Sequence, residues 1–119
     1  MIAVIFELEP AEGQREAYLD IAAGLRGELE KLDGFISVER FESLSRPGRM
    51  LSLSFFHDAA AVKAWRNLAV HRDAQARGRS GIFAGYRLRV AEVLRDYGLA
   101  DRDAAPDDSR KAHGANPDG

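Results

Sequence analysis

Apolar and polar residues alternate over the first ten positions of the chain. Every even position from 2 to 8 holds a large apolar residue, and the odd positions include Glu7 and Glu9. A period of two residues is typical of a β-strand with one buried face. Pro10 ends the pattern, so we predict a first strand over residues 2–9.

The period then lengthens to three and four residues. Apolar side chains recur in this way between Tyr18 and Leu32, with charged side chains between them, which predicts an amphipathic helix. Gly24 and Gly27 each weaken this helix by up to about 1 kcal/mol relative to alanine. They mark either close backbone packing or simple tolerance, and we favour tolerance. Gly34 follows at a position suited to the end of the helix.

Two more alternating segments cover residues 35–42 and 50–56. The Pro47-Gly48 pair between them favours a tight turn. We therefore predict two strands that form an antiparallel hairpin.

A second helix is predicted to begin after Asp58, whose carboxylate can accept hydrogen bonds from the first free backbone amides. Its apolar arc contains Trp65 and continues as a single helix to about residue 76. His71 and Gln75 lie one turn apart at the margin of that arc.

A last strand is predicted over residues 86–97. Tyr86, Leu88 and Val90 share one of its faces, and the two arginines between them share the other. The alternation shifts beyond Ala91, which predicts a bulge or a segment buried on both faces. This strand is long for so small a domain, and we expect its surplus length to pair with a second subunit.

The element order is thus β-α-β-β-α-β, and a length of 119 residues fits one domain. We assign residues 1–98 to this domain. Residues 99–119 contain five Asp, and their only apolar residues are Leu99 and scattered alanines, so they cannot bury enough apolar surface to offset their ordering entropy. We expect them to form a disordered polar tail.

Composition argues against several classes of function. The 17 Lys and Arg are outnumbered by 19 Asp and Glu, so nothing favours nucleic acid or an anionic membrane as partner. Without cysteine there is no disulfide and no thiolate ligand, and the three histidines are dispersed, so we expect no metal site. The chain start lacks the pattern of a secretory signal, and no apolar run approaches the roughly 20 residues that span a bilayer. We expect a cytoplasmic protein.

The element order, residues 32–35 (Leu-Asp-Gly-Phe), residues 64–65 (Ala-Trp) and residues 71–79 together carry a family likeness. On these features the chain resembles the antibiotic biosynthesis monooxygenase family of dimeric α+β barrel proteins, over roughly residues 1–98. The resemblance implies an α+β, ferredoxin-like protomer whose antiparallel sheet packs against that of a second copy in a homodimer. It also implies a pocket between sheet and helices, where some members oxygenate polycyclic aromatic compounds with dioxygen and no metal or organic cofactor.

Other proteins of this group degrade haem. They are similar to one another in an Asn on the first strand, a Trp on the second helix and a His ten residues after that Trp. Trp65 matches, but ten residues on the chain has Gln75, and His71 comes only six residues after the Trp. The predicted first strand also contains no Asn. Gln is a poor ligand for haem iron compared with His, so haem is disfavoured and we expect no cofactor.

Five side chains are candidates for a substrate site, mostly on the strength of the resemblance. His71, which titrates near neutral pH, is the predicted catalytic base. Gln75 and Arg79 would hold polar or anionic groups of the substrate, and Trp65 and Tyr86 would form its apolar walls.

Each candidate also has a purely structural interpretation. Trp65 at this spacing is more often a core residue between helix and sheet, and His71 can equally be a hydrogen-bonded surface histidine. One fold hosts many functions, so three hypotheses stay open. They are a cofactor-independent monooxygenase of a small aromatic or quinol-like compound, a haem-binding or haem-degrading protein, and a non-catalytic module that binds a small ligand.

Overall fold

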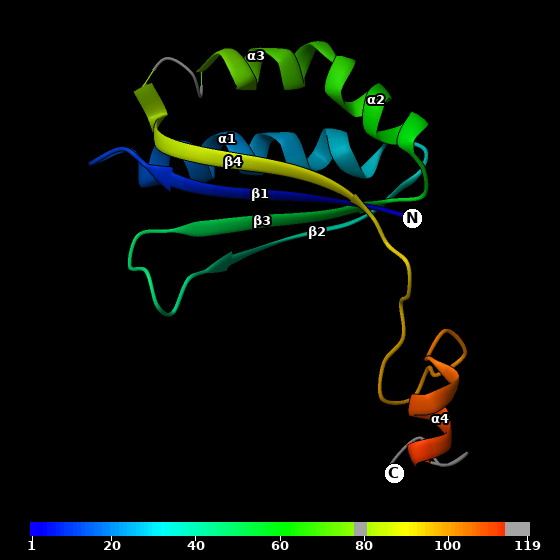
Figure 1. The fold of residues 1–119 in the computed structure, drawn as a ribbon. Helices are drawn as coiled ribbons and strands as arrows, with labels where there is room; N and C mark the ends of the chain where they lie inside the picture. Colours follow the sequence, from blue (N-terminus) through cyan, green and yellow to red (C-terminus); the bar gives the residue numbers. More distant parts are fainter. Residues whose placement is uncertain (78–80, 114–119) are drawn as a thin grey trace.

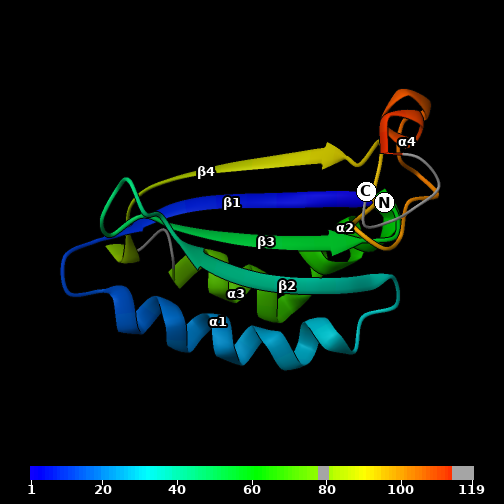
Figure 2. The same cartoon turned by 90° about the horizontal axis from the view of Figure 1, so that it is seen from below.

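Four strands and three helices form two layers in the computed structural model, which describes residues 1–77 and 81–113 apart from the side chains at positions 69–71, 74 and 113. The strands are β1 (Ile2–Pro10), β2 (Phe35–Glu42), β3 (Met50–Phe56) and β4 (Phe83–Glu92). The helices are α1 (Arg15–Glu30), α2 (Ala59–Asn67) and α3 (Ala69–Arg77). All three lie on one side of the sheet, which we call the helix-covered face (Figure 1). None of the three covers the other side, the open face (Figure 2).

The sheet is antiparallel throughout, with the strand order β2-β3-β1-β4. This order and the succession of strands and helices define a ferredoxin-like α+β fold, as predicted. The predicted bounds of β2 and β3 are those observed, and β1 is one residue longer than predicted. Asp58 caps α2 as expected, because its carboxylate accepts a hydrogen bond of 2.9 Å from the amide of Ala61.

The core between sheet and helices consists of two apolar clusters. The Leu8 cluster contains Leu8, Tyr18, Ala22 and Met50, flanked by Phe6, Leu19, Ile82 and Phe83. The Phe56 cluster contains Leu29, Val38, Phe56 and Ala61, flanked by Val4, Leu32, Phe35, Val62 and Trp65. The even positions of β1 therefore point to the helix-covered face, as the alternation predicts. Its odd positions point to the open face.

The prediction of a single second helix was wrong, because the helix is broken at Leu68. The backbone of Leu68 is extended (φ −66°, ψ 140°), and its amide donates back to the carbonyl of Trp65 at 3.2 Å. Arg72 then donates to the side-chain oxygen of Asn67 at 2.6 Å across the break. Trp65 therefore lies on α2, whereas His71 and Gln75 lie on α3. A single helical wheel therefore does not give the relative directions of these three residues.

The first helix also ends earlier than predicted, at Glu30, with Lys31 as its C-cap. Gly34 instead lies in the turn that leads into β2, with φ +90°. A β-carbon at Gly24 or Gly27 would meet no atom within 4 Å. Tolerance, rather than close backbone packing, accounts for these two glycines.

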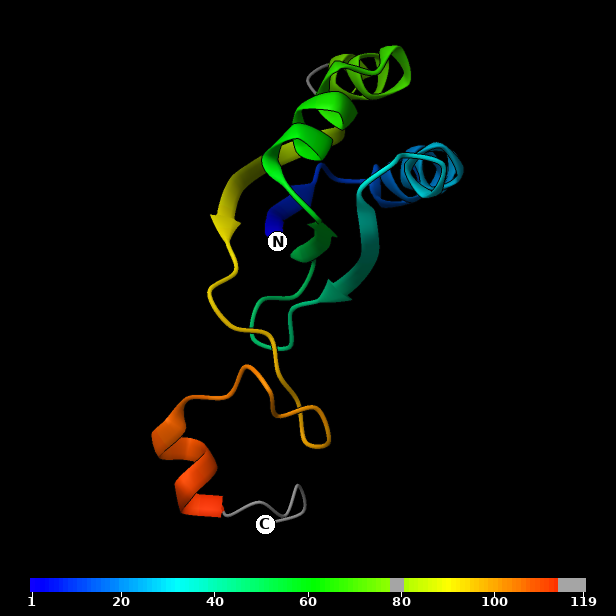
Figure 3. The same cartoon turned by 90° about the vertical axis from the view of Figure 1, so that its right-hand side faces the viewer.

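The last strand begins three residues earlier and ends five residues earlier than predicted. Its irregularity lies opposite the end of β1, between Glu9 and Pro10, and not beyond Ala91. After Glu92 the chain leaves the sheet on its open side and includes a short helix, α4 (Asp107–His113) (Figure 3). The disorder expected for the tail stays a prediction.

Candidate active site

Three large side chains of β4 lie on the helix-covered face but are not covered by a helix. Tyr86, Leu88 and Val90 are 59%, 52% and 56% exposed. Leu88 is the cross-strand partner of Phe6, and Val90 that of Val4. Directly paired residues of antiparallel strands share a face, so these three residues face the helix layer. We call Tyr86, Leu88 and Val90 the apolar strip.

Aromatic rings border one end of the apolar strip. The ring of Tyr86 lies 5.6 Å from that of Phe6 and 5.9 Å from that of Phe83, measured between centroids. Phe83 in turn meets the ring of the buried Tyr18 on α1 at 5.7 Å. These contacts place the Tyr86 ring against two aromatic residues that flank the Leu8 cluster, while more than half of the residue stays exposed.

The other end of the apolar strip lies near the Phe56 cluster. Val4, the partner of Val90, packs against this cluster, and so does Trp65 from α2. Trp65 is partly buried there, which agrees with its interpretation as a residue that fills space between helix and sheet. Its role as a substrate wall stays a prediction.

The polar candidates belong to α3 and to the segment after it. Gln75 is partly buried on α3. The backbone of His71 lies one turn earlier on the same helix, so the two residues keep the predicted spacing. The side chain of His71 and all of Arg79 lie outside the described residues, and their roles stay predictions.

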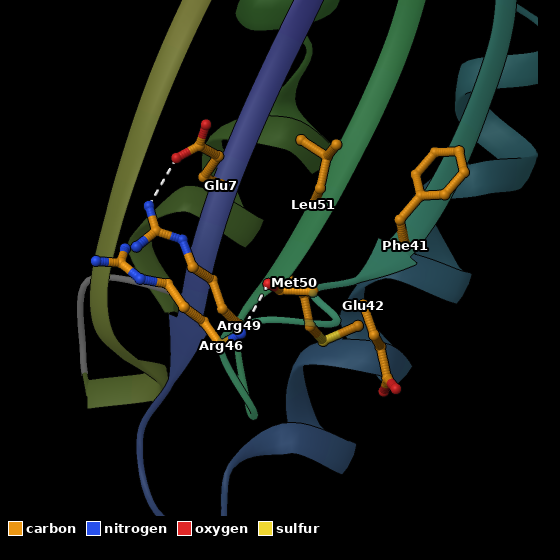
Figure 4. Close-up of a pocket in the computed structure, with 8 residues that line it drawn as sticks. Glu7, Phe41, Glu42, Arg46, Arg49, Met50 and Leu51 are labelled. Carbon is orange, nitrogen blue, oxygen red and sulfur yellow. Dashed lines mark hydrogen bonds and ion pairs between the residues drawn. The ribbon is translucent and has the colours of Figure 1, made fainter.

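The open face carries a group of interacting charges that was not predicted from the sequence. Arg49 donates to the carboxylate of Glu7 at 2.6 Å, and Arg89 donates to its other oxygen at 3.0 Å. Arg49 also approaches Glu9 at 3.8 Å. Around Glu7 and Arg49 lies a hollow of about 340 Å³ (Figure 4), also lined by Phe41, Glu42, Ser43, Arg46, Met50 and Leu51. A glutamate in the middle of an apolar strand was the available sequence signal.

The hydrogen bond from Arg49, together with the positive charge of Arg89, lowers the pKa of Glu7 below its ordinary value, although partial burial opposes the shift. A lowered pKa in the folded state stabilises the fold above the pKa of the unfolded state, and this contribution is lost as the pH falls through the folded-state value. We expect Glu7→Gln to be less stable than the wild type at pH 7. The difference should shrink as the pH falls below the usual range of glutamate, about 4.3.

Urea unfolding midpoints of the two proteins at a series of pH values between 7 and 3 measure this effect. Glu12→Gln is the matched control, because Glu12 is exposed and has no ion pair within the described part of the chain. An equal gap between wild type and Glu7→Gln at every pH would contradict the role of the two arginines.

No three His, Asp or Glu side chains of residues 1–77 and 81–113, within the described side chains, come together in a group that could hold a metal ion. Nor is any helix in this part of the chain long and apolar enough to cross a membrane.

The fold and the apolar strip define a small ferredoxin-like α+β protein with uncovered apolar side chains facing its helix layer. Residues 1–77 match the profile of the family described as antibiotic biosynthesis monooxygenase. The chain belongs to this family.

Two relatives support the assignment. A protein of Pyricularia oryzae named jasmonate monooxygenase ABM is 50% identical over 93 residues, which are 78% of this chain and 43% of that protein. The chain thus spans less than half the length of that relative. The protein YqjZ of Bacillus subtilis is 30% identical over 93 residues, 78% of this chain and 79% of its own length.

Solved structures share the fold. Rv0793 from Mycobacterium tuberculosis superposes with a TM-score of 0.73 at 18% identity, over 82% of this chain and 98% of its own. A Deinococcus radiodurans protein assigned to the antibiotic biosynthesis monooxygenases gives 0.74 at 14% identity, over 82% and 97%. At these identities the likeness supports the fold alone.

Proposed function

We propose that this protein is a cofactor-independent monooxygenase that binds a small, flat, apolar compound against the apolar strip. The supporting observation is that Tyr86, Leu88 and Val90 face the helix layer yet remain more than half exposed. Large apolar side chains that face the helices but are not covered by them leave an apolar surface that a ligand can contact. Because the chain belongs to a monooxygenase family, we infer that a compound bound to this apolar surface is oxidised there.

The reaction would need little from the protein. His71 would take a proton from the acidic C–H of an anthrone or from a hydroxyl of a quinol, and the resulting carbanion, or the ring carbon of the phenolate, would pass one electron to dioxygen. Recombination of the two radicals gives a peroxide, which loses water to leave a carbonyl. One oxygen atom enters the substrate, the other leaves as water, and no external reductant is consumed. The protein contributes the base, the orientation and the exclusion of bulk water.

The remaining candidates would orient the substrate. Tyr86 and Trp65 would contact its apolar faces, while Gln75 and Arg79 would bind its phenolate, enolate or carboxylate oxygen. Arginine suits a planar anion because its guanidinium donates from a fixed fork.

Jasmonate is a second substrate to be tested, because the relative that is 50% identical is named for it. Jasmonate is a cyclopentanone carboxylic acid and lacks the acidic benzylic methylene of an anthrone. Turnover of jasmonate but not of anthrones or quinols would keep the monooxygenase and overturn the proposed aromatic substrate class.

Oxygen uptake with a panel of anthrones, quinols, flavonoids and jasmonate tests the proposal. We expect uptake with at least one aromatic member and one oxygen atom from labelled dioxygen in its product. Hemin titration provides an independent arm: a new Soret band would favour the haem alternative. Binding of a panel compound without any uptake would favour the non-catalytic module.

The apolar strip predicts a binding defect. We expect Leu88→Asp to raise KM about tenfold or more, equivalent to at least about 1.4 kcal/mol, because the ligand would have to cover a carboxylate. Leu94→Asp is the matched control, since Leu94 lies beyond β4 and is 90% exposed. Equal KM values for the two variants would show that the substrate does not lie on the strip.

We also propose that two copies associate through the open face. This face contains apolar residues on three strands, namely Ile5, Phe41, Leu51, Leu53 and Phe55. A second copy would remove this area from water, which is favourable at roughly 25 cal/mol per Å² of apolar surface. Light scattering at micromolar concentration tests it, and a well-folded monomer would overturn it.

A further inference from the structure

Charged residues on the open face form a pattern that constrains how a second copy can sit. One transverse row of the sheet reads Glu39 on β2, Leu53 on β3, Ile5 on β1 and Arg89 on β4, each the cross-strand partner of the next. The row thus has an acidic end, two aliphatic residues and a basic end. If a second copy of the row is laid on it in the opposite order, each charged end meets the opposite charge and the two aliphatic residues meet each other.

We infer that in the proposed homodimer, on which this inference rests, the β4 edge of each copy lies against the β2 edge of the other and Arg89 pairs with the partner's Glu39. Twofold dimers use the same surface on both subunits, so the surface must complement itself. A twofold axis that runs between the two open faces, parallel to the strands, places the row of one copy over the same row of the partner in the opposite order. Arg89 then meets the partner's Glu39, and Ile5 meets the partner's Leu53.

The alternative twofold axis, which runs between the two open faces but perpendicular to the strands, is disfavoured by charge repulsion. It would place β4 over the partner's β4 and so bring arginines against arginines, because Arg87 and Arg89 both point to the open face. Like charges set against each other across an interface cost affinity.

The two charged ends cannot satisfy each other within one copy. Glu39 and Arg89 are on the outer strands of the four-stranded sheet, so three strand spacings of about 4.8 Å separate them, roughly 14 Å. Glu39 is exposed, and in the described part of the chain no ion pair or hydrogen bond engages its carboxylate. Arg89 is 53% exposed and uses Nη1 for Glu7. A guanidinium has five N–H donors, so Arg89 retains donors for a second carboxylate.

A charge-exchange experiment tests the pairing. We expect Arg89→Glu and Glu39→Arg each to weaken self-association at least about tenfold, because each variant homodimer would contain two contacts between like charges. An equimolar mixture should recover most of the wild-type affinity, since both contacts of the heterodimer again join opposite charges. Native mass spectrometry with one variant carrying a mass tag distinguishes heterodimer from homodimer.

The mixture is decisive because Arg89→Glu also removes the contact with Glu7 inside its own copy, a loss that mixing cannot repair. Glu12→Arg is the control partner. Its heterodimer with Arg89→Glu restores only one of the two charge contacts, so its affinity should lie between those of the Arg89→Glu homodimer and the wild type. Unchanged self-association of the single variants, or a mixture no tighter than they are, would overturn the pairing while leaving the sheet-face dimer. A heterodimer of Arg89→Glu with wild type that is tighter than the wild-type homodimer would overturn it in favour of β4 against β4. A monomeric wild type would remove both this inference and the proposed dimer, while the oxygen-uptake test would remain independent.

Discussion

Replacement of Gly34 by alanine is expected to lower the free energy of unfolding by about 2–5 kcal/mol. Gly34 has φ +90°, and a β-carbon there would lie only 2.7 Å from that of Ala61. Ala61 is 6% exposed within the Phe56 cluster and is a short side chain on the first turn of α2, so it cannot rotate away. The substitution therefore combines backbone strain with an overlap between the turn and the helix.

Urea unfolding monitored by circular dichroism measures the change. Gly24→Ala is the matched control, because Gly24 is a helical glycine with nothing within 4 Å of an added β-carbon. Alanine should stabilise that position by about 0.5–1 kcal/mol. Similar midpoints for Gly34→Ala and the wild type would mean that the turn and α2 separate without cost, contrary to their close packing in the structure.

Substitution of His71 by alanine is expected to lower kcat for oxygen uptake by about 10²–10⁴-fold, the usual contribution of a general base. Steady-state oxygen uptake at saturating substrate, with the variant and the wild type at equal concentration, measures this difference.

His57→Ala is the matched control for this substitution. His57 follows β3, is exposed, and contributes to the fold through its backbone amide, which donates to the carbonyl of Gly34 at 2.8 Å. Its side chain should be dispensable, and kcat should remain within about twofold of the wild type on the general expectation for exposed residues. Full turnover by His71→Ala would remove this residue from the mechanism, and the base would then have to be sought elsewhere along α3.

The sequence predicts best those elements whose signals are local. The hairpin of β2 and β3 is correct to the residue because two alternating segments flank a Pro-Gly turn, and the Asp58 cap acts within its own first turn. The face that contains Tyr86, Leu88 and Val90 was also predicted correctly, since the period of two survives a shift in the strand bounds. That the helices leave the apolar strip uncovered is a property of the packed layers, and no local pattern encodes it.

The errors have identifiable physical causes. Leu68 is a good helix former, and neither Gly nor Pro marks the break there, so helical periodicity alone extends the helix through it. The bond from Arg72 to Asn67 spans the break and accompanies the change of direction. The charged group on the open face was missed because Glu7 is separated by 42 residues from Arg49 and by 82 from Arg89. Only the assembled sheet brings these residues together.

The break at Leu68 also bears on how this protein can diversify. Trp65 and the buried Ala61 tie α2 to the Phe56 cluster, whereas α3 follows as a separate rod joined through one extended residue. The two clusters of buried residues accordingly include Ala61 of α2 and no described residue of α3. If α3 contributes to the substrate site as proposed, substitutions there can alter substrate preference while α2 keeps its packing against the Phe56 cluster, a favourable arrangement for both natural drift and directed evolution.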